Sequence, residues 1–264
     1  EGAAERYMRC LIDRHFYLRL KGLGVSDRVP LRLPLLELYV PLQARVQLPE
    51  GETWRRMRLD EKGVDPTGLE LAGRELAEHM LPGRLSKPRP VLDLLRENDG
   101  LIILGDPGAG KTTFLKYVAL KLALREGGGL GLNHRLPVLV PLSAYANALA
   151  EREVRLDDFI AAYLHDVGAD LPIAGLLGRA LAAGRALILL DGLDEVRQAR
   201  LRHIVVERVI DFYTYHRREG NKFVLTSRVV GYREVRPEAE GLAECTLVDL
   251  DEDEIMAFVR QWTA

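Results

Sequence analysis

Short apolar runs alternate with amphipathic stretches over the second two thirds of the chain. The apolar runs lie at residues 101–104, 137–142, 186–190, 223–226 and 245–248. Between and after them, apolar positions recur with helical spacing at residues 111–125, 157–167, 173–183, 199–217 and 251–262. Strands that are apolar on both faces and alternate with helices indicate a parallel sheet covered on both sides. We therefore predict a three-layer α/β domain with a mostly parallel, five-stranded sheet.

The first third of the chain is less regular. Residues 4–21 are predicted to form an amphipathic helix that ends at Gly22 and Gly24. Residues 29–46 hold three prolines and the apolar run Leu35–Leu42, which favours an extended segment. The proline-rich run at 86–90 marks a boundary. We predict a small mixed N-terminal region at 1–87 and a nucleotide-binding core at 88–264.

Composition narrows the class of protein. The 264 residues are 47% hydrophobic and 29% charged, with a net charge of −2, so a folded globular domain is expected and a dedicated nucleic-acid surface is not indicated. Cys10 and Cys245 lie far apart without metal-ligand spacing, which favours reduced thiols and a cytoplasmic location. No apolar run is long enough for a transmembrane helix, so no membrane partner is expected. The start at Glu1, not Met, suggests a piece of a longer chain.

A glycine-rich loop follows the first apolar run of the core. It matches the pattern G-x-x-x-x-G-K-[ST], in which backbone N–H groups surround phosphates and the next helix directs its positive end at them. The lysine reaches the β- and γ-phosphates, and the hydroxyl that follows it binds Mg²⁺. The chain is therefore expected to bind ATP or GTP with Mg²⁺. The predicted contacts are Gly105, Asp106, Pro107, Gly108, Ala109, Gly110, Lys111, Thr112 and Thr113, with Thr112 as a metal ligand.

Three carboxylates follow the apolar run at 186–190. Asp191 stands at the tip of that strand, where a P-loop protein needs an acidic residue near Mg²⁺. Asp194 and Glu195 come three and four residues later and are candidates to activate the attacking water. The alternative is a solvated acidic loop that caps the next helix.

Arg228 ends another apolar strand, in the run Leu225-Thr226-Ser227-Arg228. Ligands of open α/β sheets bind at the carboxyl ends of strands. If this strand lies between the P-loop strand and the Asp191 strand, Arg228 can face the γ-phosphate with a planar, permanently charged donor. The alternative is a surface arginine without such a role.

Together these segments resemble the NACHT domains of the STAND class of P-loop NTPases. The resemblance covers residues 88–262, and its most specific string is Asp191-Gly-Leu-Asp-Glu195. It implies a slow ATPase that acts as a signalling switch, in which exchange of ADP for ATP leads to self-association. It also implies effector and sensor segments elsewhere in a longer chain, a winged-helix lid beyond residue 264, and a role in innate immunity or antiphage defence.

Other P-loop classes fit less well. A small-molecule kinase or another ATPase without a switch role is the main alternative, although no arginine-bearing lid is recognisable. A GTPase needs Asn-Lys-x-Asp, and the nearest string, beginning at Asn221, lacks the aspartate. A non-catalytic scaffold remains open if Asp194 and Glu195 face solvent.

Overall fold

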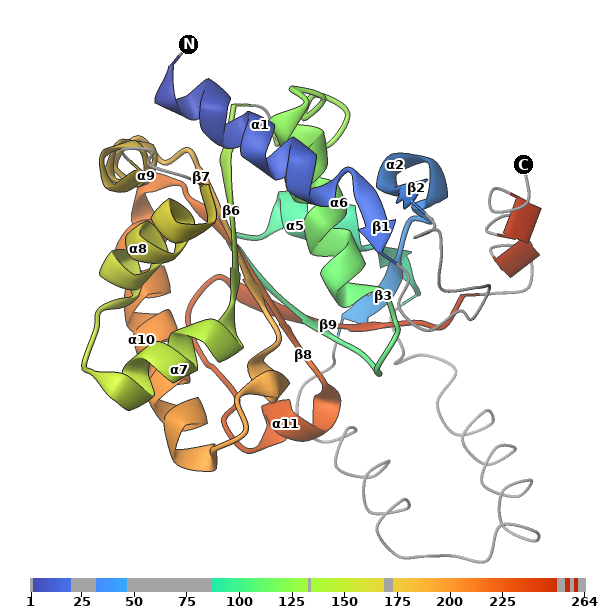
Figure 1. Ribbon diagram of the computed structural model, residues 1–264. Helices are drawn as coiled ribbons and strands as arrows, with labels where there is room; N and C mark the ends of the chain where they lie inside the picture. Colours follow the sequence, from blue (N-terminus) through green and yellow to red (C-terminus); the bar gives the residue numbers. More distant parts are fainter. Residues whose placement is uncertain are drawn as a thin grey trace, which may run out of the picture.

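A computed structural model describes residues 2–19, 32–46, 87–132, 134–168, 173–250, 255–256 and 259–260. The core is a seven-stranded sheet in the order β4-β3-β9-β5-β8-β7-β6 (Figure 1). Its parallel part consists of β5 (Gly100–Leu104), β6 (Leu136–Pro141), β7 (Ala186–Asp191), β8 (Lys222–Ser227) and β9 (Leu242–Leu247). These are the five predicted strands. The prediction of an α/β fold with a mostly parallel sheet is confirmed.

Two short antiparallel strands make the sheet wider than predicted. β3 (Gln43–Val46) pairs with β9, and β4 (Arg89–Pro90) pairs with β3. Runs of four and two residues are too short to show strand periodicity in the sequence. Because β3 comes from the N-terminal region, that region contributes directly to the central sheet.

Helices cover both faces of this sheet. α5 (Val91–Glu97) and α6 (Lys111–Ala123) pack on one face, against Leu101 and Ile103 of β5. α7 (Leu142–Glu151), α10 (Ala199–His216) and α11 (Val229–Arg233) pack on the other. α8 (Leu156–Gly168) and α9 (Ile173–Ala182) pack against each other beside β6. None of the described helices is long and apolar enough to span a bilayer.

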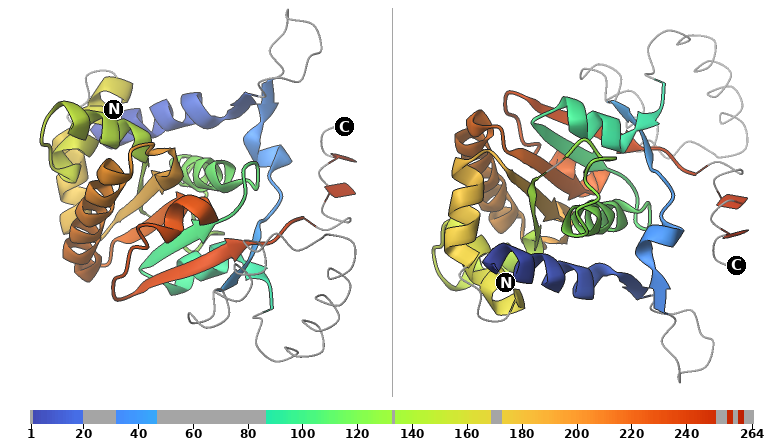
Figure 2. Two further views of the ribbon diagram at one scale, coloured as in Figure 1. Left: turned by 90° about the horizontal axis from the view of Figure 1, so that it is seen from below. Right: turned by 90° about the horizontal axis from the view of Figure 1, so that it is seen from above.

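The N-terminal helix differs from its prediction. α1 (Ala3–His15) lies across α6, as the view from above shows (Figure 2), and buries Tyr7 and Leu11. It ends at His15, because the chain then enters β1 (Tyr17–Arg19), which pairs with β2 (Arg32–Pro34). The prediction that it runs to residue 21 was wrong. Gly22 and Gly24 lie outside the described residues.

The apolar run Leu35–Leu42 is only partly extended. Its first half is a single helical turn, α2 (Leu35–Leu38), which follows the extended Pro34. Leu35 and Leu38 stand three residues apart and are both buried, so one turn places both in the core. The chain is extended at Tyr39 (ψ 119°), and Pro41 disfavours helical geometry at the residue before it. The extended prediction therefore fails for residues 35–38.

The observed ends of some helices and strands differ from the predicted ends by a few residues, and three short helices were not predicted at all. β9 begins at Leu242, earlier than the predicted residue 245, and α10 ends at His216. α5, α7 and α11 were not predicted, because each follows a strand or proline closely and offers few periodic positions. Most of the helix predicted at 251–262 lies outside the described residues.

Candidate functional site

The glycine-rich loop connects β5 to α6. All five residues of β5 are buried, which anchors the loop in the sheet. Gly108 and Gly110 take φ values of 84° and 90°, in the left-handed region that glycine adopts without strain. α6 begins at Lys111, and the first N–H groups of a helix have no partner within it. The loop and helix therefore direct backbone donors at one space, as binding of phosphates requires.

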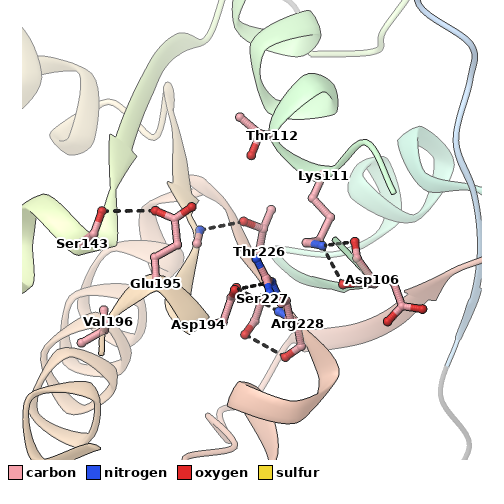
Figure 3. A network of polar contacts seen from close by, with 12 residues as sticks. Asp106, Lys111, Thr112, Ser143, Asp194, Glu195, Val196, Thr226, Ser227 and Arg228 are labelled. Atoms are coloured by element: carbon pink, nitrogen blue, oxygen red, sulfur yellow. Dashed lines mark hydrogen bonds and ion pairs between the residues drawn. The ribbon is translucent and has the colours of Figure 1, made fainter. Parts of the chain in front are cut away.

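Lys111 reaches back over this loop. Its Nζ donates to the carbonyl oxygens of Gly105 at 2.6 Å and Asp106 at 2.9 Å (Figure 3). Partial burial lowers the pKa of Lys111, and the negative charge of Asp194 acts in the opposite direction. The ammonium group thus lies at the P-loop and is held by neutral carbonyl groups.

Thr112 and Asp191 meet across the sheet edge. The Thr112 hydroxyl donates to Asp191 Oδ2 at 2.8 Å, and the Thr226 hydroxyl donates to Asp191 Oδ1 at 2.6 Å. Thr226 is fully buried and accepts a hydrogen bond from the Gly192 N–H at 2.9 Å. Two hydroxyls from neighbouring elements therefore fix the carboxylate at the end of β7.

Thr226 was not singled out from the sequence. The sequence contains one indication of its role. Thr226 is a polar residue near the carboxyl end of an otherwise apolar strand, where its side chain can contact the last residue of a neighbouring strand. Only the strand order shows which neighbour that is.

Arg228 follows β8, which lies between β5 and β7. The condition under which Arg228 can face a γ-phosphate is therefore met. Its Nε forms an ion pair with Asp194 Oδ2 at 2.8 Å, and its backbone N–H donates to Asp194 Oδ1 at 3.0 Å. The Asp194 side chain is 12% exposed and that of Arg228 is 53% exposed. Asp194 thus holds Arg228 at the site.

Glu195 lies beside Asp194 but has different partners. Ser143, at the start of α7, donates to Glu195 Oε2 at 3.3 Å (Figure 3). The Glu195 side chain packs over Gly192, where an added Cβ would come within 2.9 Å of the carboxyl carbon. Gly192 also has a φ of 74°. A side chain at residue 192 would displace Glu195, and Ser143 is a second contact that sequence reasoning missed.

These side chains line one cavity of about 270 Å³. Its size is slightly below the range for drug-like ligands, about 300–1,000 Å³, and suits a phosphate chain. Gly105, Asp106 and Ala109 are not among the lining residues, although the first two bind Lys111 through their carbonyls. The cavity is lined by Pro107, Gly108, Gly110, Lys111, Thr112, Thr113, Asp191, Gly192, Asp194, Glu195, Thr226 and Arg228.

The donor set beside Thr112 fits Mg²⁺. A hydroxyl and a carboxylate are hard oxygen ligands, and they lie 2.8 Å apart here. Within the described residues no cluster of three or more His, Cys, Asp or Glu could hold a metal ion. Mg²⁺ in nucleotide sites needs few protein ligands, because water and phosphate oxygens complete its shell.

Comparison with known proteins agrees with this geometry. The model of a family described as "NACHT domain" matches residues 99–264, which is more than half of the chain. The match includes the P-loop, the strand end with Asp191, and Arg228. No curated protein matches the chain.

Proposed function

Because the chain belongs to the NACHT domain family of P-loop NTPases, we propose that it is a cytoplasmic ATP- and ADP-dependent signalling switch. In this proposal it binds MgATP, self-associates in the ATP-bound form and hydrolyses ATP slowly. Effector and sensor segments of a longer chain would supply the output and the input, in innate immunity or antiphage defence. Membership in the family supports nucleotide binding in general. Self-association, slow hydrolysis and the role in signalling are proposed in addition.

One observation carries this proposal: polar side chains from the start of α6 and from the ends of β7 and β8 line one cavity, as a network with two parts. One part joins Thr112, Asp191 and Thr226, and the other pairs Asp194 with Arg228. The second part includes a cation that has a carboxylate partner, since Arg228 pairs with Asp194 at 2.8 Å. A γ-phosphate in the cavity would offer Arg228 a second anionic partner. A diphosphate would leave the Asp194 pair undisturbed. The network can therefore distinguish ATP from ADP by a change of partner.

The binding roles follow from the contacts. Lys111 would transfer its hydrogen bonds from the loop carbonyls to the β- and γ-phosphates, which are charged and therefore stronger acceptors. Thr112 and Asp191 would hold Mg²⁺, with Thr226 fixing the carboxylate. Mg²⁺ bound there would neutralise charge on the phosphate oxygens.

Glu195 is the better supported general base of the two carboxylates. It lines the cavity, and within the described part of the chain its carboxylate accepts only a 3.3 Å hydrogen bond, from Ser143, so it keeps capacity to accept a proton from water. Asp194 is engaged with both the side chain and the backbone N–H of Arg228. We assign Asp194 the role of positioning Arg228.

The test is to measure mass and nucleotide content of the full-length protein with ADP and then with a non-hydrolysable ATP analogue. The switch proposal expects a monomer with ADP and a larger assembly with the analogue, each with one nucleotide per chain. The Lys111→Ala protein should remain monomeric with either nucleotide. An unchanged mass together with transfer of phosphate to a small acceptor would instead identify a kinase.

A further inference from the structure

A larger cavity lies at the edge of the sheet opposite the nucleotide site. It has a volume of about 960 Å³ and is bounded by α1, the C-terminal end of α6, the loop before β6, and α9. Figure 1 shows these elements together at the end of α6 remote from the P-loop. The two cavities share no lining residue. It is therefore a separate site, and its function does not depend on the switch proposal.

Its charge contrasts with that of the whole chain. Five arginines line it, whereas Glu5 is its one acidic lining residue among the described residues. Glu5 forms an ion pair with Arg125 at 3.1 Å. The chain as a whole has a net charge of −2. Such a local excess of cations in a concave space raises the local concentration of anions. The five are Arg9, Arg125, Arg135, Arg179 and Arg185.

The arginines differ in the protein groups that they already contact. Arg135 donates to three carbonyl oxygens, those of Gly184, Ala186 and Gly220, at 2.9–3.3 Å, so it supports the loops around it. Arg179 and Arg185 are exposed, and within the described residues their side chains form no hydrogen bond or ion pair. These two guanidinium groups can bind an anion without giving up a protein partner.

The floor of the cavity is apolar. Met8 and Ile12 of α1 and Leu176 of α9 line it and are partly buried. A volume near 960 Å³ lies in the range of small-molecule pockets, about 300–1,000 Å³, which combine apolar walls with a few placed polar groups. Nucleic-acid backbones, by contrast, follow extended basic grooves or stripes. A concave site with an apolar floor and a cationic rim fits a small amphiphilic anion.

We propose that this cavity binds a small phosphorylated ligand with an apolar or aromatic body. Arginine presents a planar fork that binds two oxygens of a carboxylate or a phosphate at once, and the additional oxygens and charge of a phosphate suit a site with two such forks. Arg179 and Arg185 hold the phosphates, and the side chains of Met8, Ile12 and Leu176 contact the body. This site serves a second ligand, distinct from the nucleotide at the P-loop.

The test uses Lys111→Ala protein, in which P-loop binding is weakened, and calorimetric titration with ADP, pyrophosphate and adenosine. ADP is expected to bind more tightly than pyrophosphate, because it adds an aromatic body, and adenosine should not bind measurably. The further change Arg179→Gln with Arg185→Gln should weaken ADP binding about tenfold or more, since two charge-assisted contacts are lost. A matched control carries Arg152→Gln with Arg218→Gln, two exposed arginines outside the cavity, and should bind as before.

Three results would overturn the proposal. ADP binding that is absent up to about 10 mM, well beyond a millimolar dissociation constant, would show that the cavity is not a phosphate site. Equal weakening by the test pair and the control pair would show only a general effect of charge. Binding of a single-stranded oligonucleotide with the same dependence on Arg179 and Arg185, without binding of ADP, would identify a nucleic-acid surface instead. Thermal unfolding of each variant checks that the fold is retained.

Discussion

Charged side chains gather at both ends of the parallel strands, the carboxyl edge and the amino edge of the sheet, but they differ in whether they have protein partners. At the carboxyl edge, Lys111 binds loop carbonyls, and Arg228 binds Asp194. At the amino edge, Arg179 and Arg185 make no ion pair with any described residue. Both edges concentrate cations in a cavity, but Lys111 and Arg228 have protein partners at the first, whereas Arg179 and Arg185 have none among the described residues at the second.

The difference predicts two kinds of binding. At the nucleotide site a ligand must replace contacts that Lys111 and Arg228 already make with the protein. Affinity therefore depends on how much stronger the ligand's contacts are than the protein contacts they replace, and it is sensitive to the chemical nature of the ligand. At the arginine cavity, Arg179 and Arg185 give up no partner among the described residues, so affinity should depend on the phosphate contacts and on the apolar body that the ligand brings. The nucleotide edge is thus suited to a switch between two states, whereas the opposite edge is suited to simple capture.

The largest effect is expected from Glu195→Gln. If Glu195 activates water, this change should lower the rate of ATP hydrolysis by about 10²-fold or more and leave MgATP affinity intact. Steady-state hydrolysis and calorimetry measure the two quantities. The full-length protein should then accumulate with ATP bound, in longer-lived assemblies. Unchanged hydrolysis in both Glu195→Gln and Asp194→Asn would show that neither carboxylate activates water.

Lys111→Ala tests whether Lys111 contributes to MgATP affinity by exchanging its loop carbonyl partners for phosphate oxygens. A charge-assisted contact to phosphate contributes about 1.5–3 kcal/mol, so MgATP affinity should fall about 10- to 100-fold. Lys116→Ala is the matched control, because Lys116 lies on the same helix but does not line the nucleotide cavity. Calorimetry that gave the same affinity for Lys111→Ala and the control would remove Lys111 from the site.

His15 extends the comparison to a group that is buried without a charge. Burial, together with Lys116 and Arg14, lowers the pKa of His15 from 6.5 to about 4. The unfolded chain therefore binds a proton as pH falls below about 6.5, whereas the folded chain does not until near pH 4. The free energy of unfolding should decrease by about 2 kcal/mol between pH 7 and pH 5 from this group. His15→Gln should lose that part of the slope in denaturant titrations at several pH values. Equal slopes would show that His15 is not held neutral.

The smallest effect is expected from Arg228→Ala. This change should weaken ATP about tenfold, the loss of one charge-assisted contact, and leave ADP affinity nearly unchanged, because a diphosphate offers Arg228 no γ-phosphate. Competition with a fluorescent nucleotide measures both affinities under the same conditions. If the affinities for ATP and ADP fall equally, Arg228 has a structural role and does not exchange Asp194 for a γ-phosphate.

The features that the sequence predicted correctly depend on local pattern. Buried parallel strands are apolar on both faces, so β5, β7 and β8 were recognisable without knowledge of their neighbours. The P-loop motif is contiguous and Asp191 is the last residue of β7, so both could be located from the sequence, although their roles in binding phosphate and Mg²⁺ also stay predictions. The roles assigned to Asp194, Glu195 and Arg228 stay predictions, although the structure brings all three to one cavity.

The features that the sequence could not predict depend on which distant segments meet. The contact between Asp194 and Arg228 requires β8 to lie beside β7, and strand order has no local signature. The arginine cavity draws its five arginines from segments between residues 9 and 185, with no basic run in any of them. β3 and α2 have four residues each, too few to repeat the strand or helix period often enough to be recognised.

The position of β9 has a consequence for synthesis of the protein on the ribosome. β9 pairs with β5 on one side and with β3 on the other, and the partners Ala44 and Leu247 are about 200 residues apart. The other neighbour of β5 is β8, which is also made late. The strand that supports the P-loop therefore leaves the ribosome with both edges unpaired, and its edges can be paired only after β8 and β9 have been made. During that interval its apolar surface is open to wrong pairing, so chaperone protection of nascent chains should matter most between translation of β5 and β9.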